Sequence, residues 1–561
     1  MNEPKLIPPK FPRLFLYFLG AILILNLIQA QFTELIFDEA YYWYYSKSLS
    51  FGYFDHPPMV AWMIYLGGLL FDGELGVRLI SCFMSAGTIV ILWLLIDRAK
   101  KNDFIPHFFV LVFSMTLLNA YGFFTLPDTP LLFFTALFLL VYKKFLDRPT
   151  MLKALWMGLA MAALMYSKYH AVLVILFVLL SNPGLLTNKY AWFSVWVAIS
   201  AYLPHFWWLY DNDFISVKYH LFERPNDAYQ FKKYTLGFFL NMIAIFGLTF
   251  PWIYQSLFRT KSQDKFIKAL LYLTYGVLIF FFISSFNRRV QTQWIIVISI
   301  PLVLLVFNDM LGHENTRKWI LRMGILNIAV LLYLRLGLVF EPLFPIHYES
   351  HGNKKWVQEL KSKVGDMPVI FENSYRLAPM YTFYSGSPSY SLNNINYRQN
   401  QYSIDDSEAK VQHQKVFYVS PFLPQESVAF TMLDGEVFYG RYIDDFESFR
   451  KLKCDLDQIS YSLQSGETYA LRVINPYDTD VDISKLKFAV AYMNPNKRIQ
   501  DIIPIKPKLV LHNKPVLKSN DTTRFTFLLP KPEMERPSYF RIGISENGLL
   551  FGLNGNSIKL D

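Results

Sequence analysis

The chain has 561 residues, of which 53% are hydrophobic, 18% aromatic and only 17% charged. This composition excludes a disordered protein and argues against an ordinary soluble one, and its long apolar runs predict a polytopic α-helical membrane protein. Many of the Lys and Arg residues behind the net charge of +10 lie in short loops between apolar runs, which indicates membrane orientation rather than nucleic-acid binding. The two cysteines, Cys82 and Cys454, give neither a disulfide framework nor paired metal ligands.

About eleven segments are apolar and long enough to cross a membrane as helices of ~20 residues each. The first, near 14–32, follows a basic start and lacks a small-residue cleavage site, so we expect an uncleaved signal anchor. The segment 57–71 is short and aromatic, which predicts a helix lying along the membrane interface. The other predicted spans lie near 76–97, 104–123, 128–146, 151–167, 170–182, 190–210, 234–257, 267–285, 294–311 and 319–340.

The positive charges support a cytoplasmic N-terminus. Alternation of the spans from that start places about 18 Lys and Arg in inside segments and about 8 in outside segments, in agreement with the positive-inside rule. Because the number of spans is odd, the chain after Phe340 is expected outside, on the same face as the long first loop at 33–75.

After Phe340 the composition changes to one typical of soluble domains. We predict a membrane domain at 1–340, an α/β domain at 341–458 and a β-sandwich at 459–561. The α/β prediction rests on a helix at 356–363 and short strands at 368–372 and 415–419. The sandwich prediction rests on strands separated by Asn, Pro, Asp and Gly turns, at 469–475, 487–493, 524–529 and 539–545.

Polar residues collect at the outer ends of the predicted spans. Cations on several helices beside carboxylates at a bilayer interface suit an anionic lipid headgroup, since Arg and Lys neutralise phosphate while an acid serves as base. The candidates are Asp38, Glu39, Asp55 and His56 in the first loop, Asp128, Lys168 with Tyr169, His220 with Glu223 and Arg224, and Arg288 with Arg289.

Several of these residues also have a structural explanation. Asp128, Asp38 and Glu39 stand where an acid can cap a helix. Lys168 lies in a very short turn between spans, where an ionisable group is costly unless it has a partner, which favours a function. Arg335 lies within the last span, where function and outward snorkelling are both open.

A divalent metal held by Asp55 and a distant histidine, His220, is a weaker alternative because no histidine spacing supports it; otherwise no cofactor is expected. No phosphate-binding or dinucleotide-binding glycine motif is present, which argues against a cytoplasmic nucleotide site.

Four strings occur in order: F-D-E-A-Y-Y-W, G-Y-F-D-H-P-P-M, L-P-D-T-P-L-L-F-F and Y-S-K-Y-H-A-V. Together they resemble bacterial relatives of the protein O-mannosyltransferases and of the lipid A aminoarabinose transferases, over roughly 1–340. The resemblance implies the GT-C fold, and transfer of a sugar from a polyprenyl-phosphate carrier to an acceptor outside the cytoplasmic membrane. It implies that Asp38 is the catalytic acid of the first loop and that Asp55 with His56 contacts the carrier phosphate. The aminoarabinose branch has Lys where this chain has His56, which makes the mannosyltransferase-like branch closer. Residues 375–401 resemble the outer domain of bacterial members more weakly.

The sequence therefore predicts a glycosyltransferase of the bacterial inner membrane with a periplasmic C-terminal region. Its expected partners are an undecaprenyl-phosphate sugar, membrane lipids and a lipid, glycan or protein acceptor, with no nucleic acid. The candidate catalytic residues are Asp38, Glu39 and Asp128; those for the donor phosphate are His56, Lys168, Tyr169, Arg288 and Arg289; and Asp55, His220 and Arg224 are further site residues. A lipid-linked sugar flippase and an O-antigen ligase or polymerase are the alternatives.

Overall fold

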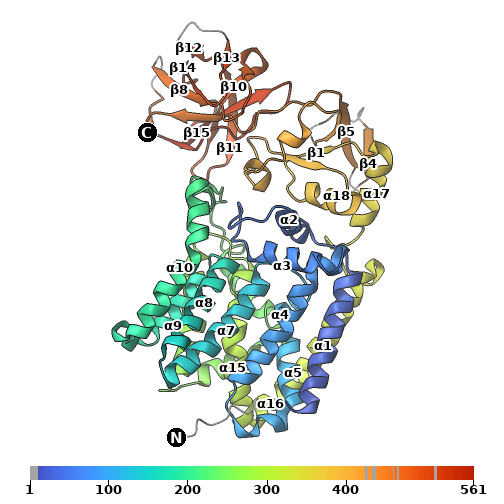
Figure 1. Ribbon diagram of the computed structural model, residues 1–561, viewed down its shortest axis with the longest axis vertical. Helices are drawn as coiled ribbons and strands as arrows, with labels where there is room; N and C mark the ends of the chain where they lie inside the picture. Colours follow the sequence, from blue (N-terminus) through green and yellow to red (C-terminus); the bar gives the residue numbers. More distant parts are fainter. Residues whose placement is uncertain are drawn as a thin grey trace. The chain divides into compact units, whose positions relative to one another are not determined.

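The computed structural model describes residues 11–421, 423, 428–431, 437–458, 460–463, 467–510 and 515–561. They form two compact units. The first is helical and comprises 11–52, His56–Tyr210 and Tyr229–His351, and the second, which holds the β-sheets, comprises Tyr53–Asp55, Asp211–Ala228 and Gly352–Asp561 (Figure 1).

The first unit contains the helices α1 (Arg13–Phe32), α2 (Phe37–Ser46), α3 (Met59–Gly68), α4 (Gly73–Leu95), α5 (Ile105–Ser114), α6 (Thr116–Ala120), α7 (Asp128–Asp147), α8 (Met151–Ser167), α9 (Ala171–Leu180), α10 (Lys189–Asp211), α12 (Thr235–Ala244), α13 (Phe250–Arg259), α14 (Lys265–Ser284), α15 (Ser299–Gly312) and α16 (Glu314–Val339). Most of these helices lie in the predicted apolar segments, but the predicted spans 104–123 and 234–257 are each divided into two helices, and α2 lies in the predicted first loop. The predicted interface segment contains α3, a helix of 10 residues.

In the described residues, five helices are long and apolar enough to cross a membrane, namely α1, α4, α7, α14 and α16. The pair α12 and α13 makes a sixth if its bend of 100° is counted within one span. The bend includes Gly247, whose φ of +57° is a backbone conformation that favours glycine. The chain is therefore a multi-pass membrane protein, while the number of about eleven spans stays a prediction, because α8, α9 and α15 are apolar but shorter.

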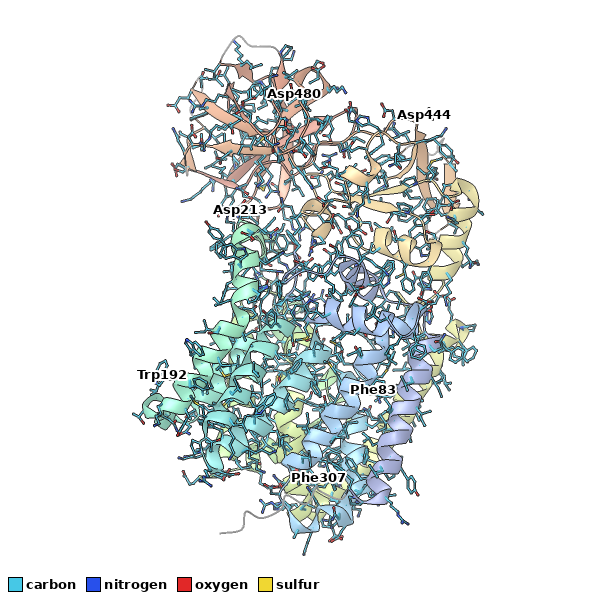
Figure 2. The ribbon with its side chains drawn as sticks, viewed as in Figure 1. Phe83, Trp192, Asp213, Phe307, Asp444 and Asp480 are labelled. Carbon is cyan, nitrogen blue, oxygen red and sulfur yellow. The ribbon has the colours of Figure 1, made fainter. Side chains whose placement is uncertain are left out.

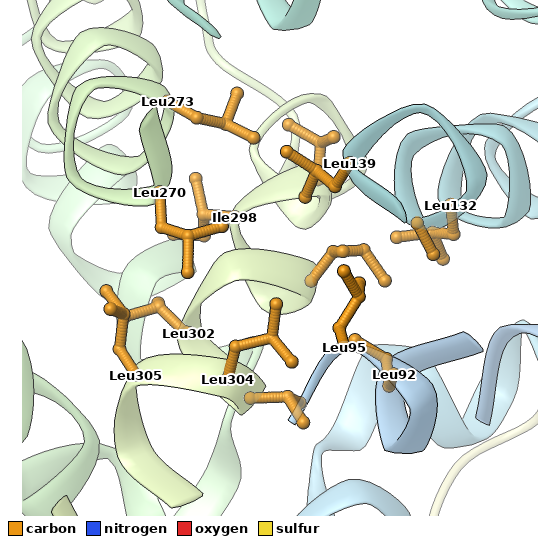
Figure 3. Packing of buried hydrophobic residues seen from close by; sticks show 14 of the residues in the cluster. Leu92, Leu95, Leu132, Leu139, Leu270, Leu273, Ile298, Leu302, Leu304 and Leu305 are labelled. Atoms are coloured by element: carbon orange, nitrogen blue, oxygen red, sulfur yellow. The ribbon is translucent and has the colours of Figure 1, made fainter. Parts of the chain in front are cut away.

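The helical unit has a leucine-rich interior and an apolar exterior. Figure 3 shows Leu92 and Leu95 of α4 near Leu132 and Leu139 of α7, with leucines of α14 and α15 completing the cluster. By contrast, Trp192 on α10 and Phe83 on α4 are 57% and 51% exposed, and Trp192 points outward at the edge of the helices (Figure 2). Large apolar side chains exposed on the helices of a membrane protein are stable in contact with lipid, because there they are not exposed to water.

The second unit contains a mixed sheet with the strand order β2-β1-β3-β5-β4. β1 pairs in parallel with β2 and β3, whereas β5 runs antiparallel to β3 and β4. The elements are α17 (Asn353–Val364), β1 (Val369–Glu372), α18 (Leu377–Ser385), β2 (Ser389–Leu392), β3 (Val416–Val419), β4 (Val428–Thr431) and β5 (Val437–Ile443). An α/β arrangement is therefore present where the sequence predicts one.

The remaining strands form a sandwich around one hydrophobic core. In the described residues its sheets have the orders β11-β10-β15-β16-β7 and β12-β14-β8-β6, with a ribbon of β9 and β13. The strands are β6 (Lys453–Leu456), β7 (Ser460–Tyr461), β8 (Thr468–Ile474), β9 (Val481–Asp482), β10 (Leu486–Met493), β11 (Ile499–Ile505), β12 (Lys508–Leu509), β13 (Val516–Leu517), β14 (Thr522–Leu528), β15 (Tyr539–Glu546) and β16 (Ile558–Leu560). The separation into domains at 341–458 and 459–561 stays a prediction.

Candidate active site

Glu39 is the most completely engaged acid of the first loop. It lies in the first turn of α2 with no solvent exposure, and its carboxylate forms a double contact with Arg78 of α4, with Nε–Oε1 at 2.8 Å and Nη2–Oε2 at 2.6 Å. The backbone N–H of Thr125 donates to the same carboxylate at 2.8 Å. Arg78 also donates to backbone carbonyls of the α1–α2 connection, including that of Thr33 at 2.6 Å. This ion pair therefore fixes α2 against α4 and against the chain leading into α7.

Asp38, the neighbour of Glu39, is half-exposed on the first turn of α2. Its carboxylate lies close enough to interact electrostatically with the hydroxyls of Tyr121 and Tyr348, and Asp128 acts on the same Tyr121 hydroxyl. Both acids therefore act electrostatically on the same tyrosine. Of the two adjacent acids, Asp38 is partly exposed and Glu39 is buried.

Asp128 and Lys168 form a buried ion pair. Asp128 is the first residue of α7 and Lys168 directly follows α8, and the Lys168 ammonium lies 2.7 and 2.9 Å from the two carboxylate oxygens. The two side chains are only 6% and 4% exposed. An acid at the start of α7 is also favoured by the helix dipole. Lys168 therefore has a carboxylate partner, as expected if its role is to stabilise the structure.

The other predicted phosphate ligands also belong to the helical unit. The Tyr169 hydroxyl lies 3.2 Å from Nε2 of His205, whose Nδ1 lies 2.7 Å from the carbonyl oxygen of Phe51. His56 is half-buried, with its ring edge-on to Tyr42 at 5.6 Å between centroids. Arg288 and Arg289 follow α14; Arg288 is half-buried and Arg289 exposed.

Asp55, His220 and Arg224 belong to the second unit. Arg398 donates from Nη2 to both carboxylate oxygens of Asp55, at 2.5 and 2.6 Å, so that carboxylate is engaged by a cation. Nε2 of His220 faces the backbone oxygen of Asp55 at 3.2 Å, and burial lowers the pKa of His220 although Asp55 opposes the shift and Arg224 reinforces it. With its carboxylate held by arginine, Asp55 does not fit a metal site with His220.

A different group offers three possible metal ligands among the described residues. Glu341, His347 and His351, after α16, hold their ligand atoms within 4.8 Å of one another. However, His351 already uses both ring nitrogens, with Nε2 2.9 Å from the Gly337 oxygen and Nδ1 accepting from the Tyr348 N–H at 3.3 Å. The group therefore fits a metal only if His351 gives up one of these bonds, and no cofactor is assigned.

Sequence reasoning missed the partners Arg78 and Arg398. Arg78 lies within a predicted apolar span, where an ionisable residue usually has a partner or a function, and this position could have identified it. Arg335 carried the same signal, and its guanidinium is buried rather than snorkelling: it donates to Asn119 at 2.8 Å and Asn26 at 2.9 Å. Within the described residues, its Nη1 has no hydrogen-bond acceptor.

Comparisons with known proteins identify relatives of this arrangement. Residues 55–208 match the sequence model of the dolichyl-phosphate-mannose-protein mannosyltransferases. The chain is 24% identical over 277 residues to the lipid A galacturonosyltransferase RgtD of Rhizobium johnstonii, covering 47% of this chain and 58% of RgtD. It is 28% identical over 267 residues to the lipopolysaccharide core galacturonosyltransferase RgtA of the same organism, covering 44% and 51%. The aligned region thus spans little more than half the length of these curated relatives.

The fold also has a solved counterpart. The crystal structure of ArnT from Cupriavidus metallidurans bound to undecaprenyl phosphate aligns with 76% of this chain and 98% of that chain, with 14% identity and a TM-score of 0.55. This likeness confirms the predicted GT-C fold class. The matched family and both relatives are glycosyltransferases by name, which confirms the predicted family resemblance and enzyme class.

Proposed function

We propose that this chain is a GT-C glycosyltransferase that transfers a sugar from a polyprenyl-phosphate carrier to an acceptor at the membrane surface. Undecaprenyl phosphate, the molecule bound to ArnT, is the proposed carrier. The names of RgtD and RgtA favour lipid A or a lipopolysaccharide core as the acceptor class and a uronic acid as one sugar to test. These matches favour a transferase over the flippase alternative.

The observation that carries this proposal is the contrast between the adjacent acids Asp38 and Glu39. Arg78 neutralises Glu39 at 2.6 Å in the interior, so Glu39 supports α2, and Asp38, which is partly exposed, is the proposed base. Asp38 accepts the proton of an acceptor hydroxyl while that oxygen attacks the anomeric carbon. The bond from the anomeric carbon to the phosphate oxygen breaks, and the polyprenyl phosphate leaves with the bonding electrons.

Cations must stabilise the negative charge that develops on the leaving phosphate. His56, Arg288 and Arg289, with Tyr169 as a hydrogen-bond donor, are the proposed groups. Lys168 has two proposed roles, contact with this phosphate or support of Asp128, and the ion pair at 2.7 Å favours the second. Asp128 in turn orients the donor or acceptor near Tyr121.

We place the reaction at the periplasmic face of a bacterial inner membrane. The support is the excess of Lys and Arg in the predicted inside loops, together with the first loop and the region after Phe340 on the opposite face.

Mass spectrometry of lipid A, envelope glycans and glycoproteins tests the function in cells with and without the gene. Transfer predicts a species in the first cells that is heavier by one sugar unit and absent from the second. The matched control is the same gene encoding Asp38→Asn, which should resemble the deletion. Identical envelopes with and without the gene, in cells that supply polyprenyl-phosphate sugars, would contradict the proposal.

A further inference from the structure

A cavity of about 70 Å³ lies within the second unit, and none of the groups assigned to transfer lines it. It is enclosed by three stretches: the π-helical turn Tyr219–Glu223 with Pro225, the loop after β2, and the sandwich around the β10–β11 turn and β15. Its volume is several times the ~10–15 Å³ that one water needs, so a small polar group fits inside.

Positive charge dominates the described lining. Arg398, Lys497, Arg498 and Arg541 line the cavity, whereas Glu223 is the one carboxylate among the described lining residues. Asp55 pairs with Arg398 and Asp227 with Arg498, while Lys497 and Arg541 share Glu223. Three carboxylates therefore face four cations, and the remaining positive charge favours an anionic ligand.

Glu223 is the carboxylate that two of the cations share. Its Oε2 accepts from Nη2 of Arg541 at 2.9 Å and from the Ser557 hydroxyl at 2.6 Å, and its Oε1 accepts from Lys497 at 3.2 Å. Nε of Arg541 is buried and has no hydrogen-bond acceptor in the part of the chain that the structure describes. Arg541 is thus left with a donor that a ligand oxygen can satisfy.

The rest of the lining suits a sugar. Asn396, Gln399 and Asn556 offer amide groups that both donate to and accept from hydroxyls, and Tyr397 offers an aromatic ring with a polar tip. Aromatic rings with a few polar groups at fixed positions are the usual composition of a small-molecule pocket.

We propose that this cavity binds a phosphate or carboxylate group carried on a saccharide. Guanidinium groups recognise both anions through paired N–H donors, which is why two sources of the charge are considered together. The site goes beyond the proposed transfer reaction, since none of its groups is assigned to the chemistry. Binding to it is therefore measurable even if the proposed activity is wrong.

Isothermal titration calorimetry on the full-length protein in detergent tests the proposal. The probes are glucose 6-phosphate, glucuronate, neutral glucose and inorganic phosphate. We expect at least one anionic sugar to bind at millimolar concentration or below, and neutral glucose not to bind. Arg498→Gln and Arg541→Gln should each weaken binding roughly tenfold, because each removes a charge-assisted hydrogen bond.

Arg472→Gln is the matched control, because Arg472 lies in β8, pairs with Asp455 at 2.6 Å and is absent from the cavity lining. Thermal unfolding is measured on every variant, and Arg498, which is 55% exposed, decides the test if Arg541→Gln fails to fold. Three results would overturn the proposal: no heat from either anionic sugar, wild-type binding in Arg498→Gln, or equal binding of neutral glucose. Inorganic phosphate bound as tightly as glucose 6-phosphate would overturn the saccharide assignment and leave a free-phosphate site.

Discussion

Two adjacent carboxylates in one helical turn have opposite environments in this protein. Glu39 is fully buried against Arg78, and Asp38 is half-exposed beside Tyr121 and Tyr348. Residues next to each other on a helix point in directions about 100° apart, so one faces the interior while the other faces the site. Substitutions at the two positions should therefore have different consequences.

Asp38→Asn keeps the size and hydrogen bonding of the side chain but removes the base. We expect sugar transfer to fall by roughly 10²-fold or more at unchanged protein level and melting temperature. Transfer assayed in membranes measures this, with the exposed Asp103→Asn as the control. If the variant turns over near the wild-type rate, the catalytic base is another acid, such as Asp128.

Glu39→Gln should act on stability instead. It leaves the Arg78 guanidinium buried without its counter-charge, and breaking a buried ion pair from one side costs about 3–5 kcal/mol. The melting temperature in detergent should drop, and a second change, Arg78→Met, should recover part of the loss. A Glu39→Gln protein that melts normally but transfers nothing would instead assign Glu39 to the chemistry.

Lys168→Met separates the two roles of Lys168. If Lys168 supports Asp128, the variant leaves an uncompensated buried acid and should lose about 3–5 kcal/mol of stability. If Lys168 contacts the donor phosphate, the variant should melt normally and be inactive, and Lys168→Arg should restore activity only partly because its planar fork has a different shape. Thermal unfolding measured beside transfer distinguishes these outcomes, and we expect the first.

At the scale of elements, segments from the predicted outer loops are built into the second unit. Asp55 from the first loop pairs with Arg398, and Glu223 and Asp227 pair with cations on or beside the sandwich, with Asp227 2.9 Å from Arg498. Several of these pairs are partly exposed, so each contributes little stability by itself. Their shared effect is to fix where the segments 53–55 and 211–228 lie within that unit.

The sandwich strand β15 should make stability depend on pH. Burial raises the pKa of Glu546 at the end of β15 to about 7, with Arg450 opposing the shift and Glu408 adding to it. Between pH 4.5 and about 7, Glu546 is therefore protonated in the folded protein but ionised in the unfolded chain, where its pKa is near 4.5. Stability should fall as pH rises from about 4.5 to about 7, by up to about 3 kcal/mol.

Melting temperatures between pH 5 and 8 check this dependence. Glu546→Gln should reduce the slope, while the exposed Glu535→Gln should keep it. Some slope should remain in Glu546→Gln because burial also raises the pKa of the neighbouring Glu408. Equal slopes in wild type and Glu546→Gln would contradict the assignment.

At the scale of the whole molecule, the topology is open to a labelling test. Lys100→Cys and Lys261→Cys should react with a membrane-impermeant thiol reagent only after the cells are opened, because the charge count places them inside. Arg289→Cys and Lys518→Cys should react in intact cells. The native Cys82 and Cys454 are buried and give little background. Labelling at 100 in intact cells, or none at 518, would overturn the topology.

The sequence alone determined the elements of this protein. Apolar runs predicted the positions of its helices, and alternating strands separated by turn residues predicted the α/β region and the sandwich, because such patterns are local. The motif strings likewise predicted the GT-C fold that the ArnT alignment confirms, and they singled out Asp38, Asp128 and Lys168.

Only the tertiary structure decided which charges are partners. Glu39 lies 39 residues from Arg78, Asp128 lies 40 from Lys168, and Asp55 lies 343 from Arg398. A carboxylate has the same local pattern whether an arginine neutralises it or a substrate reaches it. The difference arises from desolvation and from neighbours that packing brings in from distant parts of the chain, and no local pattern contains that information.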